Sequence, residues 1–156
     1  MTRRPPYLLA LLATLLVLTG YAITLAPTVT FWDAGELIAA SRTLGIPHPP
    51  GTPLFVMIGH VWAALLPITE YAVRTNLLSA TLSALAAGFL FLVVHDGLGR
   101  LTAAETPEWG RLVTVGGSFA ATLAAAFCFT VWQNSNETEV YAAATFTIAL
   151  VCWLCL

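Results

Sequence analysis

The residues best suited to chemistry gather in one short stretch, TFWDAGELIAASRTLGIPHPPG, at residues 30–51. It holds two carboxylates, Asp33 and Glu36, followed by Arg42 and His48. A carboxylate can accept a proton from a hydroxyl, a guanidinium can bind a phosphate, and an imidazole can carry a proton near neutral pH. These residue types indicate an acid–base or anion-binding site, but their spacing alone names no reaction.

Asp33 and Glu36 are three residues apart, so a helix that begins nearby places both on one face. Two interpretations are open. In a capping box, Asp33 is the N-cap and Glu36 reaches back to the first backbone N–H. In a functional site, the helix start orients both carboxylates toward a substrate. The two interpretations are compatible.

The neighbours of these acids have comparable alternatives. Trp32, with Phe31, would lie at headgroup depth as an interface anchor, or form the wall of a sugar or lipid-phosphate pocket. Arg42 would bind phosphate or extend toward lipid headgroups. His48 precedes two prolines, which favour an extended backbone, and is a candidate for hydrogen bonding or proton handling.

A second polar stretch, QNSNETEVY at 133–141, contains Glu137, Glu139 and Tyr141. Glu137 and Tyr141 would share a helix face, and the acids also suit the positive end of a helix dipole. Asn136-Glu137-Thr138 matches the short and unspecific glycosylation sequon. We expect neither a metal site nor a cofactor, because the three histidines lie in separate regions.

The rest of the chain is strongly apolar. Of its 156 residues, 58% are hydrophobic and 9% charged, against about 25% charged in soluble domains. Too few polar residues exist to cover a water-soluble globule, so we predict a membrane protein. The sequence lacks a basic stripe, so nucleic acid is not an expected partner. The cysteines (Cys128, Cys152 and Cys155) lie in apolar runs and are interpreted as packing residues.

The fold class expected is an all-α membrane protein with about four transmembrane helices. Residues 1–156 would form a single multi-pass domain, and its elements follow from apolar runs of spanning length and from proline and glycine breaks. The predicted spans are 7–25, 75–95, 112–132 and 142–156, and the predicted interfacial helices are 34–44 and 53–67. A polar loop is expected at 95–111. A cleaved signal peptide is the alternative interpretation of the first run.

Arginines set the expected orientation, because positive charge concentrates on the cytoplasmic side. Arg3, Arg4, Arg100 and Arg111 flank the first span and the 95–111 loop. The N-terminus is therefore predicted to be cytoplasmic in a plasma or inner membrane. Both acidic stretches then face the extracytoplasmic side, where they would meet. The fourth apolar run reaches the last residue, which suggests the N-terminal part of a larger, split or truncated membrane fold.

Three segments together resemble a known family. PTVTFWDAGELIAAS (27–41), LGIPHPPGTPLF (44–55) and WQNSNETEVYAAAT (132–145) are similar to the protein O-mannosyltransferase-like membrane proteins of the GT-C glycosyltransferase class. The resemblance covers essentially the whole chain but only the front portion of a family member. The run with HPPG is specific, whereas the third segment alone is weak.

The resemblance implies transfer of a sugar, with mannose expected, from a polyprenyl-phosphate donor to a protein or glycan hydroxyl. It makes Asp33 the candidate base and Glu36 its support or substitute. Trp32, Arg42 and His48 would serve the donor or order the loop. Glu137, Glu139 and Tyr141 would complete the acceptor side.

The implied partners are the lipid-linked donor, the acceptor, the bilayer, and any remaining helices of a longer or split enzyme. Two alternatives come from other classes. One is a non-catalytic lipid-binding or assembly module, and the other is a transporter, against which the absence of mid-span charges counts.

Overall fold

The chain is described here by a computed structural model that covers residues 5–48 and 52–156. Within these ranges every regular element is a helix: α1 (Tyr7–Ile23), α2 (Ala34–Thr43), α3 (Pro53–Leu65), α4 (Tyr71–Leu101), α5 (Pro107–Ala126), α6 (Phe129–Ser135) and α7 (Val140–Leu154). The all-α fold class is confirmed.

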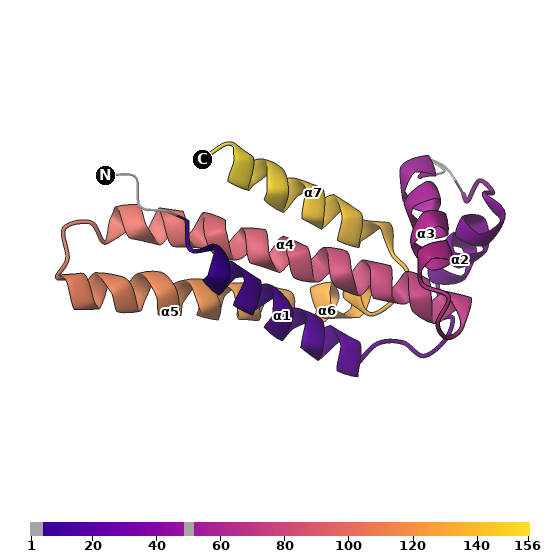
Figure 1. The fold of residues 1–156 in the computed structure, drawn as a ribbon, viewed down its shortest axis with the longest axis horizontal. Coiled ribbons are helices and arrows are strands. Elements are labelled where there is room, and N and C mark those ends of the chain that lie inside the picture. The colour runs from indigo at the N-terminus through magenta and orange to yellow at the C-terminus, as the bar shows by residue number, and fades with distance from the viewer. Residues whose placement is uncertain (1–4, 49–51) are drawn as a thin grey trace.

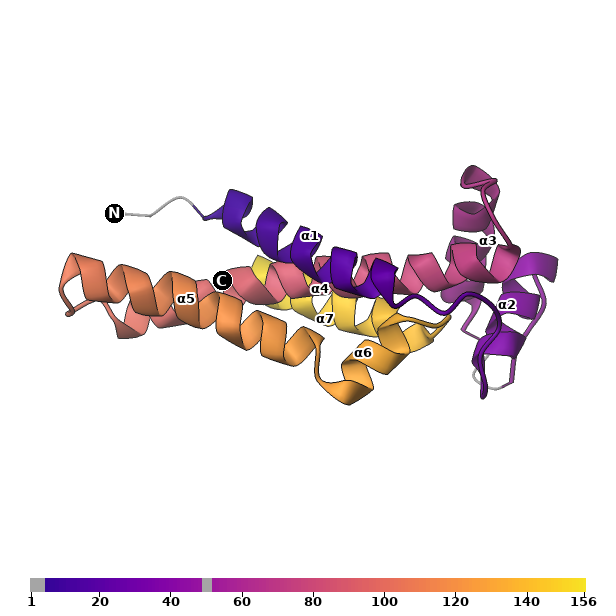
Figure 2. The same ribbon diagram turned by 90° about the horizontal axis from the view of Figure 1, so that it is seen from below.

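The long helix α4 is the centre of the molecule. Helices α1, α5 and α7 run along it, while α2 and α3 lie beside its N-terminal end (Figures 1 and 2). The start of α1 and the connection between α4 and α5 lie at the opposite end. Arg100 and Arg111 belong to that end, and Arg3 and Arg4 lie outside the described residues. The arrangement agrees with the arginine distribution, while the orientation in a membrane stays a prediction.

Small residues allow the helices to approach α4 closely. Val17 and Tyr21 of α1 pack against Ala80 and Ala84 of α4 in one buried cluster. At Gly88 of α4, an added Cβ would collide with the Thr14 hydroxyl of α1. Close packing of this kind is how helices associate where water supplies no hydrophobic force between them.

The prediction of about four spanning helices is not confirmed. Among the described residues, α4 is long and apolar enough to cross a membrane, and α5 with α6 passes only as a pair bent by 68°. Helices α1, α3 and α7 are apolar but only 10–17 residues long. At 1.5 Å per residue such helices are shorter than a bilayer core of about 30 Å.

The predicted span 112–132 is wrong as one helix, because the chain breaks between α5 and α6. The Tyr21 hydroxyl of α1 donates a hydrogen bond of 2.7 Å to the Ala126 carbonyl. In an uninterrupted helix that carbonyl would accept the N–H of Thr130. The Phe127 ring then packs edge-on against Tyr21 at 5.6 Å between centroids. A side chain of α1 therefore binds the last backbone carbonyl of α5, in place of the next turn of that helix.

Two predicted boundaries are also wrong. The span expected at 75–95 extends over Tyr71–Leu101, so most of the predicted 95–111 loop is helical and the connection to α5 is short. Asp96 and Arg100 form an ion pair of 2.7 Å one turn apart on this extension. Such i, i+4 pairs support exposed helix ends, which explains how a polar segment remains helical.

Candidate functional site

The segment before α2 projects aromatic side chains outward. Phe31 and Trp32 are each 88% exposed, and Trp32 has a left-handed backbone with φ of 66°. A bulky residue rarely adopts this conformation, and such strained positions concentrate at functional sites. The unusual backbone turns the chain directly into Asp33 and the start of α2.

Asp33, Glu36 and His48 form one cluster. Both oxygens of Glu36 bind His48: Oε1 accepts the backbone N–H at 2.7 Å, and Oε2 accepts the ring Nδ1 at 2.7 Å. The other ring nitrogen, Nε2, faces Asp33 Oδ2 at 3.8 Å. That distance is too long for a hydrogen bond, so the Asp33 carboxylate keeps its accepting capacity. The two prolines that follow His48 lie outside the described residues.

The capping-box interpretation is wrong in its side-chain contacts. Asp33 is the N-cap residue by position, and its backbone carbonyl accepts the N–H of Leu37 at 2.9 Å, yet its side chain makes no capping bond. Glu36 binds His48 instead of reaching back to the backbone of Asp33. Neither carboxylate therefore caps the start of α2, and that of Glu36 makes a tertiary contact with His48 instead.

The cluster shifts the charge states of its members. The hydrogen bond from Glu36, its negative charge and the charge of Asp33 raise the pKa of His48 above its usual 6.5. The same contact, first through the ring and then through the backbone N–H, lowers the pKa of Glu36. His48 therefore carries its positive charge to a higher pH than a free imidazole.

Glu137 and Glu139 have the opposite environment. They are only 8% and 6% exposed, and no described arginine or lysine pairs with them. Burial, followed by the negative charges of Glu137 and Asp33, raises the pKa of Glu139 to about 7. Leu37 of α2 and Val140 of α7 belong to one cluster around Leu78 of α4, so the two acidic stretches meet in space.

Polar side chains at the start of α4 hold these two stretches together. The Asn76 amide donates to the carbonyls of Ala26 and Thr28, at 2.9 and 3.2 Å, in the segment leading to Asp33. Its oxygen accepts the Thr138 hydroxyl at 2.6 Å. One buried amide therefore joins both loops.

Two further contacts complete this attachment of the second stretch to α4. The Thr138 hydroxyl lies 2.9 Å from Thr75 Oγ1. One residue on, the backbone N–H of Glu139 donates to Ser79 Oγ at 3.1 Å. Thr75, Asn76, Ser79, Thr138 and Glu139 are all buried, so water does not compete for the hydrogen bonds among them.

Arg42 and Tyr141 are not brought into the cluster. The Arg42 guanidinium lies over the Tyr71 ring, 5.6 Å from its centroid, and six residues along α2 separate it from Glu36 by about 9 Å of helix. Tyr141 is 61% exposed and lines a different cavity of about 430 Å³ with Ser83 and Asn134. Their proposed contacts with substrate have no support from this geometry.

The sequon at 136–138 is explained by packing. Thr138 is fully buried and its hydroxyl is already used by Asn76 and Thr75. A glycosylation acceptor belongs on an exposed loop. In the part of the chain that the structure describes, no group of three histidine, cysteine or acidic residues has a metal-binding arrangement.

Sequence reasoning missed Asn76, and with it the reason for Thr138. An asparagine inside a predicted span was the available signal, because an amide there needs partners within the protein. The pairing with Ala26, Thr28 and Thr138 could not be found from sequence, since it joins residues about 50 and 62 positions away.

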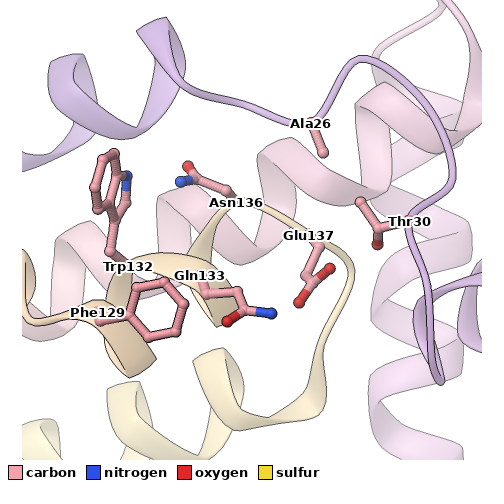
Figure 3. Close-up of a pocket in the computed structure, with 7 residues that line it drawn as sticks. All are labelled: Ala26, Thr30, Phe129, Trp132, Gln133, Asn136 and Glu137. Carbon is pink, nitrogen blue, oxygen red and sulfur yellow. The ribbon is translucent and has the colours of Figure 1, made fainter.

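A second group, on α6, was missed for a different reason. Trp132 donates its indole N–H to Thr24 Oγ1 at 2.9 Å, and the Thr24 hydroxyl lies 3.3 Å from Asn136 Oδ1. These contacts depend on the bend after Phe127, which the prediction of a straight span did not include. Trp132 and Asn136 belong to the wall of a cavity of about 260 Å³, which is also lined by Ala26, Thr30, Phe129, Gln133 and Glu137 (Figure 3).

Comparison with known proteins gives consistent relatives. The family model described as "Protein O-mannosyl-transferase TMEM260 N-terminal domain" matches residues 33–156. Protein O-mannosyl-transferase TMEM260 of Mus musculus is 33% identical over 131 residues, which cover 84% of this chain and 17% of that protein. Its namesake in Dictyostelium discoideum is 26% identical over 140 residues, covering 86% of this chain and 15% of that protein. The chain thus spans less than a fifth of these relatives, and no solved structure matches it.

Proposed function

Because the chain belongs to the family of TMEM260 N-terminal domains, we propose that it forms the front part of a membrane glycosyltransferase. The reaction is transfer of a sugar, mannose by the relatives' names, from a polyprenyl-phosphate donor to a hydroxyl of a protein or glycan. The single observation that carries the proposal is the Asp33–His48–Glu36 cluster at the N-terminal end of α2.

Asp33 is the base in this proposal, and Glu36 is a positioning residue. Both oxygens of Glu36 are occupied by His48, which also lowers the pKa of Glu36 and makes it a weaker base. Asp33 is 56% exposed at its side chain, and its side chain makes no hydrogen bond to the residues that the structure describes. Its carboxylate is therefore available to an acceptor hydroxyl.

The step balances with these residues. Asp33 takes the proton as the acceptor oxygen forms a bond to the anomeric carbon of the sugar. The bond from that carbon to the phosphate oxygen breaks, and the polyprenyl phosphate leaves with the electron pair. His48, held protonated by Glu36, presents Nε2–H to the phosphate and offsets its charge.

The position of the cluster favours a lipid-linked donor. Phe31 and Trp32, which directly precede Asp33, and Ile46, two residues before His48, are all exposed. In this proposal the aromatic residues lie at headgroup depth of the extracytoplasmic leaflet, where a phosphate meets cations while its lipid tail stays in the bilayer. The N-terminus is cytoplasmic, and the first outer loop carries α2 and α3.

The experiment is a sugar-transfer assay in membranes with a polyprenyl-phosphate-mannose donor. It compares the native protein with Asp33→Asn and with Asp96→Asn, a matched change at the far end of α4. We expect Asp33→Asn to abolish most transfer and Asp96→Asn to leave it intact. Undiminished transfer by Asp33→Asn would remove Asp33 as the base. If the native protein transfers no sugar, either alone or as the complete natural protein, the non-catalytic module becomes the better interpretation.

A further inference from the structure

The cavity between α6 and the segment before α2 is separate from the Asp33–His48–Glu36 cluster. It has a volume of about 260 Å³, smaller than the roughly 300–1,000 Å³ of sites for drug-sized ligands. Figure 3 shows the Phe129 and Trp132 rings at one side, with Gln133 and Glu137 nearer the facing Thr30. The space suits one ring rather than a chain of them.

Glu137 is the most informative residue of this cavity. It is 92% buried, because its exposed fraction is 8%, and it lines the space. Within the described residues its carboxylate accepts no hydrogen bond and pairs with no cation. Neither Glu137 oxygen is among the fully buried atoms without a partner, so the carboxylate opens into the cavity, where it can accept hydrogen bonds from the donors of a ligand.

Two other polar groups of the wall have no partner in the described protein, whereas Asn136 is already paired with Thr24. The exposed side-chain amide of Gln133 makes no hydrogen bond there, and Thr30 Oγ1 is buried without a partner. Trp132 is different, because its N–H is fixed by Thr24. That bond holds the indole in place and leaves its face to a ligand.

We propose that this cavity binds one pyranose ring through its hydroxyls. Such a ring offers an apolar C–H face to Trp132 and Phe129, and it presents several O–H donors and acceptors to Glu137, Gln133 and Thr30. A phosphate is disfavoured by the Glu137 carboxylate, and a purely apolar ligand would leave that carboxylate unpaired. The substrate class is therefore a neutral hexose.

This inference deepens the proposed function, and the sugar has two possible sources. It is the sugar of the lipid-linked donor, or a sugar on the acceptor or product. Thr30 lies three residues before Asp33, so the cavity and the proposed base are joined by one short segment.

The test measures binding to the complete natural protein in lipid nanodiscs by saturation-transfer NMR. The probes are methyl α-mannoside, a short-chain polyprenyl-phosphate mannose and a mannosylated peptide. We expect Glu137→Gln and Trp132→Ala each to weaken binding by about tenfold, the effect of one lost charge-assisted hydrogen bond or stacking contact. Trp109→Ala, at the start of α5, is the matched control and should bind normally.

Each outcome decides the proposal. Weakening with the lipid-linked probe assigns the ring to the donor, and weakening with the peptide probe assigns it to the acceptor or product. Gln133→Ala provides a milder variant should Trp132→Ala fail to fold. Binding that is absent in the native protein, or unchanged in Glu137→Gln and Gln133→Ala, overturns the proposal. Asp33→Asn should abolish transfer but not binding of methyl α-mannoside, so failure of the proposed reaction and failure of the sugar site are distinguishable.

Discussion

The two acidic stretches contain the same kind of residues in opposite surroundings. Asp33 and Glu36 are about half exposed, and a histidine lies between them. Glu137 and Glu139 are buried, and no cation accompanies them. The first pair is accessible to solvent, whereas burial raises the pKa of Glu139 to about 7. The first pair is therefore suited to taking a proton, and the second to receiving hydroxyl groups.

This difference comes from what each pair is attached to. His48 belongs to the same outer loop as Asp33 and Glu36, so the first cluster is assembled locally. The second pair is fixed from α4, where Ser79 and Asn76 bind the backbone and side chains of residues 138 and 139. The long helix therefore sets the separation between the two stretches.

The largest expected effect compares one acid from each stretch. Asp33→Asn should lower kcat for sugar transfer by about 10²–10⁴-fold, the usual contribution of a general base. Glu139→Gln should change kcat by much less, since its carboxylate is buried beside the substrates rather than free to take the proton. Steady-state kinetics of both variants check this. A larger loss in Glu139→Gln than in Asp33→Asn would reverse the assignment.

The next effect tests whether α4 holds the two stretches together. Asn76→Ala removes three hydrogen bonds and leaves the Thr138 hydroxyl and two carbonyls with fewer partners. We expect a loss of stability of about 2–4 kcal/mol. Thermal unfolding in detergent measures it. Asn134→Ala, whose amide bonds only within α6, should cost far less, and equal losses would count against a special role for Asn76.

How much of this was accessible from sequence depends on the range of each contact. Asp33, Glu36 and His48 lie within 16 residues, and their proximity followed from a short helix and a proline-rich return. The bend after Phe127 was missed because no proline or glycine marks it. Its cause, the Tyr21 hydroxyl, lies 105 residues away in sequence. The loop expected at 95–111 was too long because polar composition suggested a loop, whereas the Asp96–Arg100 pair supports a helix there.

The third prediction concerns the cation of the exposed cluster. The pKa of His48 is raised by Glu36, so its positive charge should persist above pH 6.5 and disappear as pH rises through the raised value. His48→Gln should weaken binding of polyprenyl phosphate about tenfold at pH 6. The difference from native protein should shrink at high pH.

Glu36→Gln provides the finer test of the same contact. It keeps the size of the side chain but removes the charge that favours the imidazolium. In this variant, the pH at which affinity for polyprenyl phosphate falls should therefore move from the native value toward 6.5. Titration of donor binding against pH checks both variants, and a pH profile of Glu36→Gln identical to that of the native protein would contradict the positioning role of Glu36.

The smallest expected effect concerns the buried pair and has a definite sign. The pKa of Glu139 is about 7 in the folded protein against an ordinary 4.5, so the folded state binds more protons between these values. Stability should fall as pH rises from 4.5 to 7, and Gln at this position should remove the fall. At pH 8 Glu139→Gln should be more stable by roughly 1–2 kcal/mol, and at pH 4.5 no more stable than the native protein. Unfolding midpoints at the two pH values measure this, with exposed Glu108→Gln as the matched control. A gain of the same size at both pH values would mean that Glu139 is not held against ionisation, and the contrast between the two acidic stretches would then rest on exposure alone.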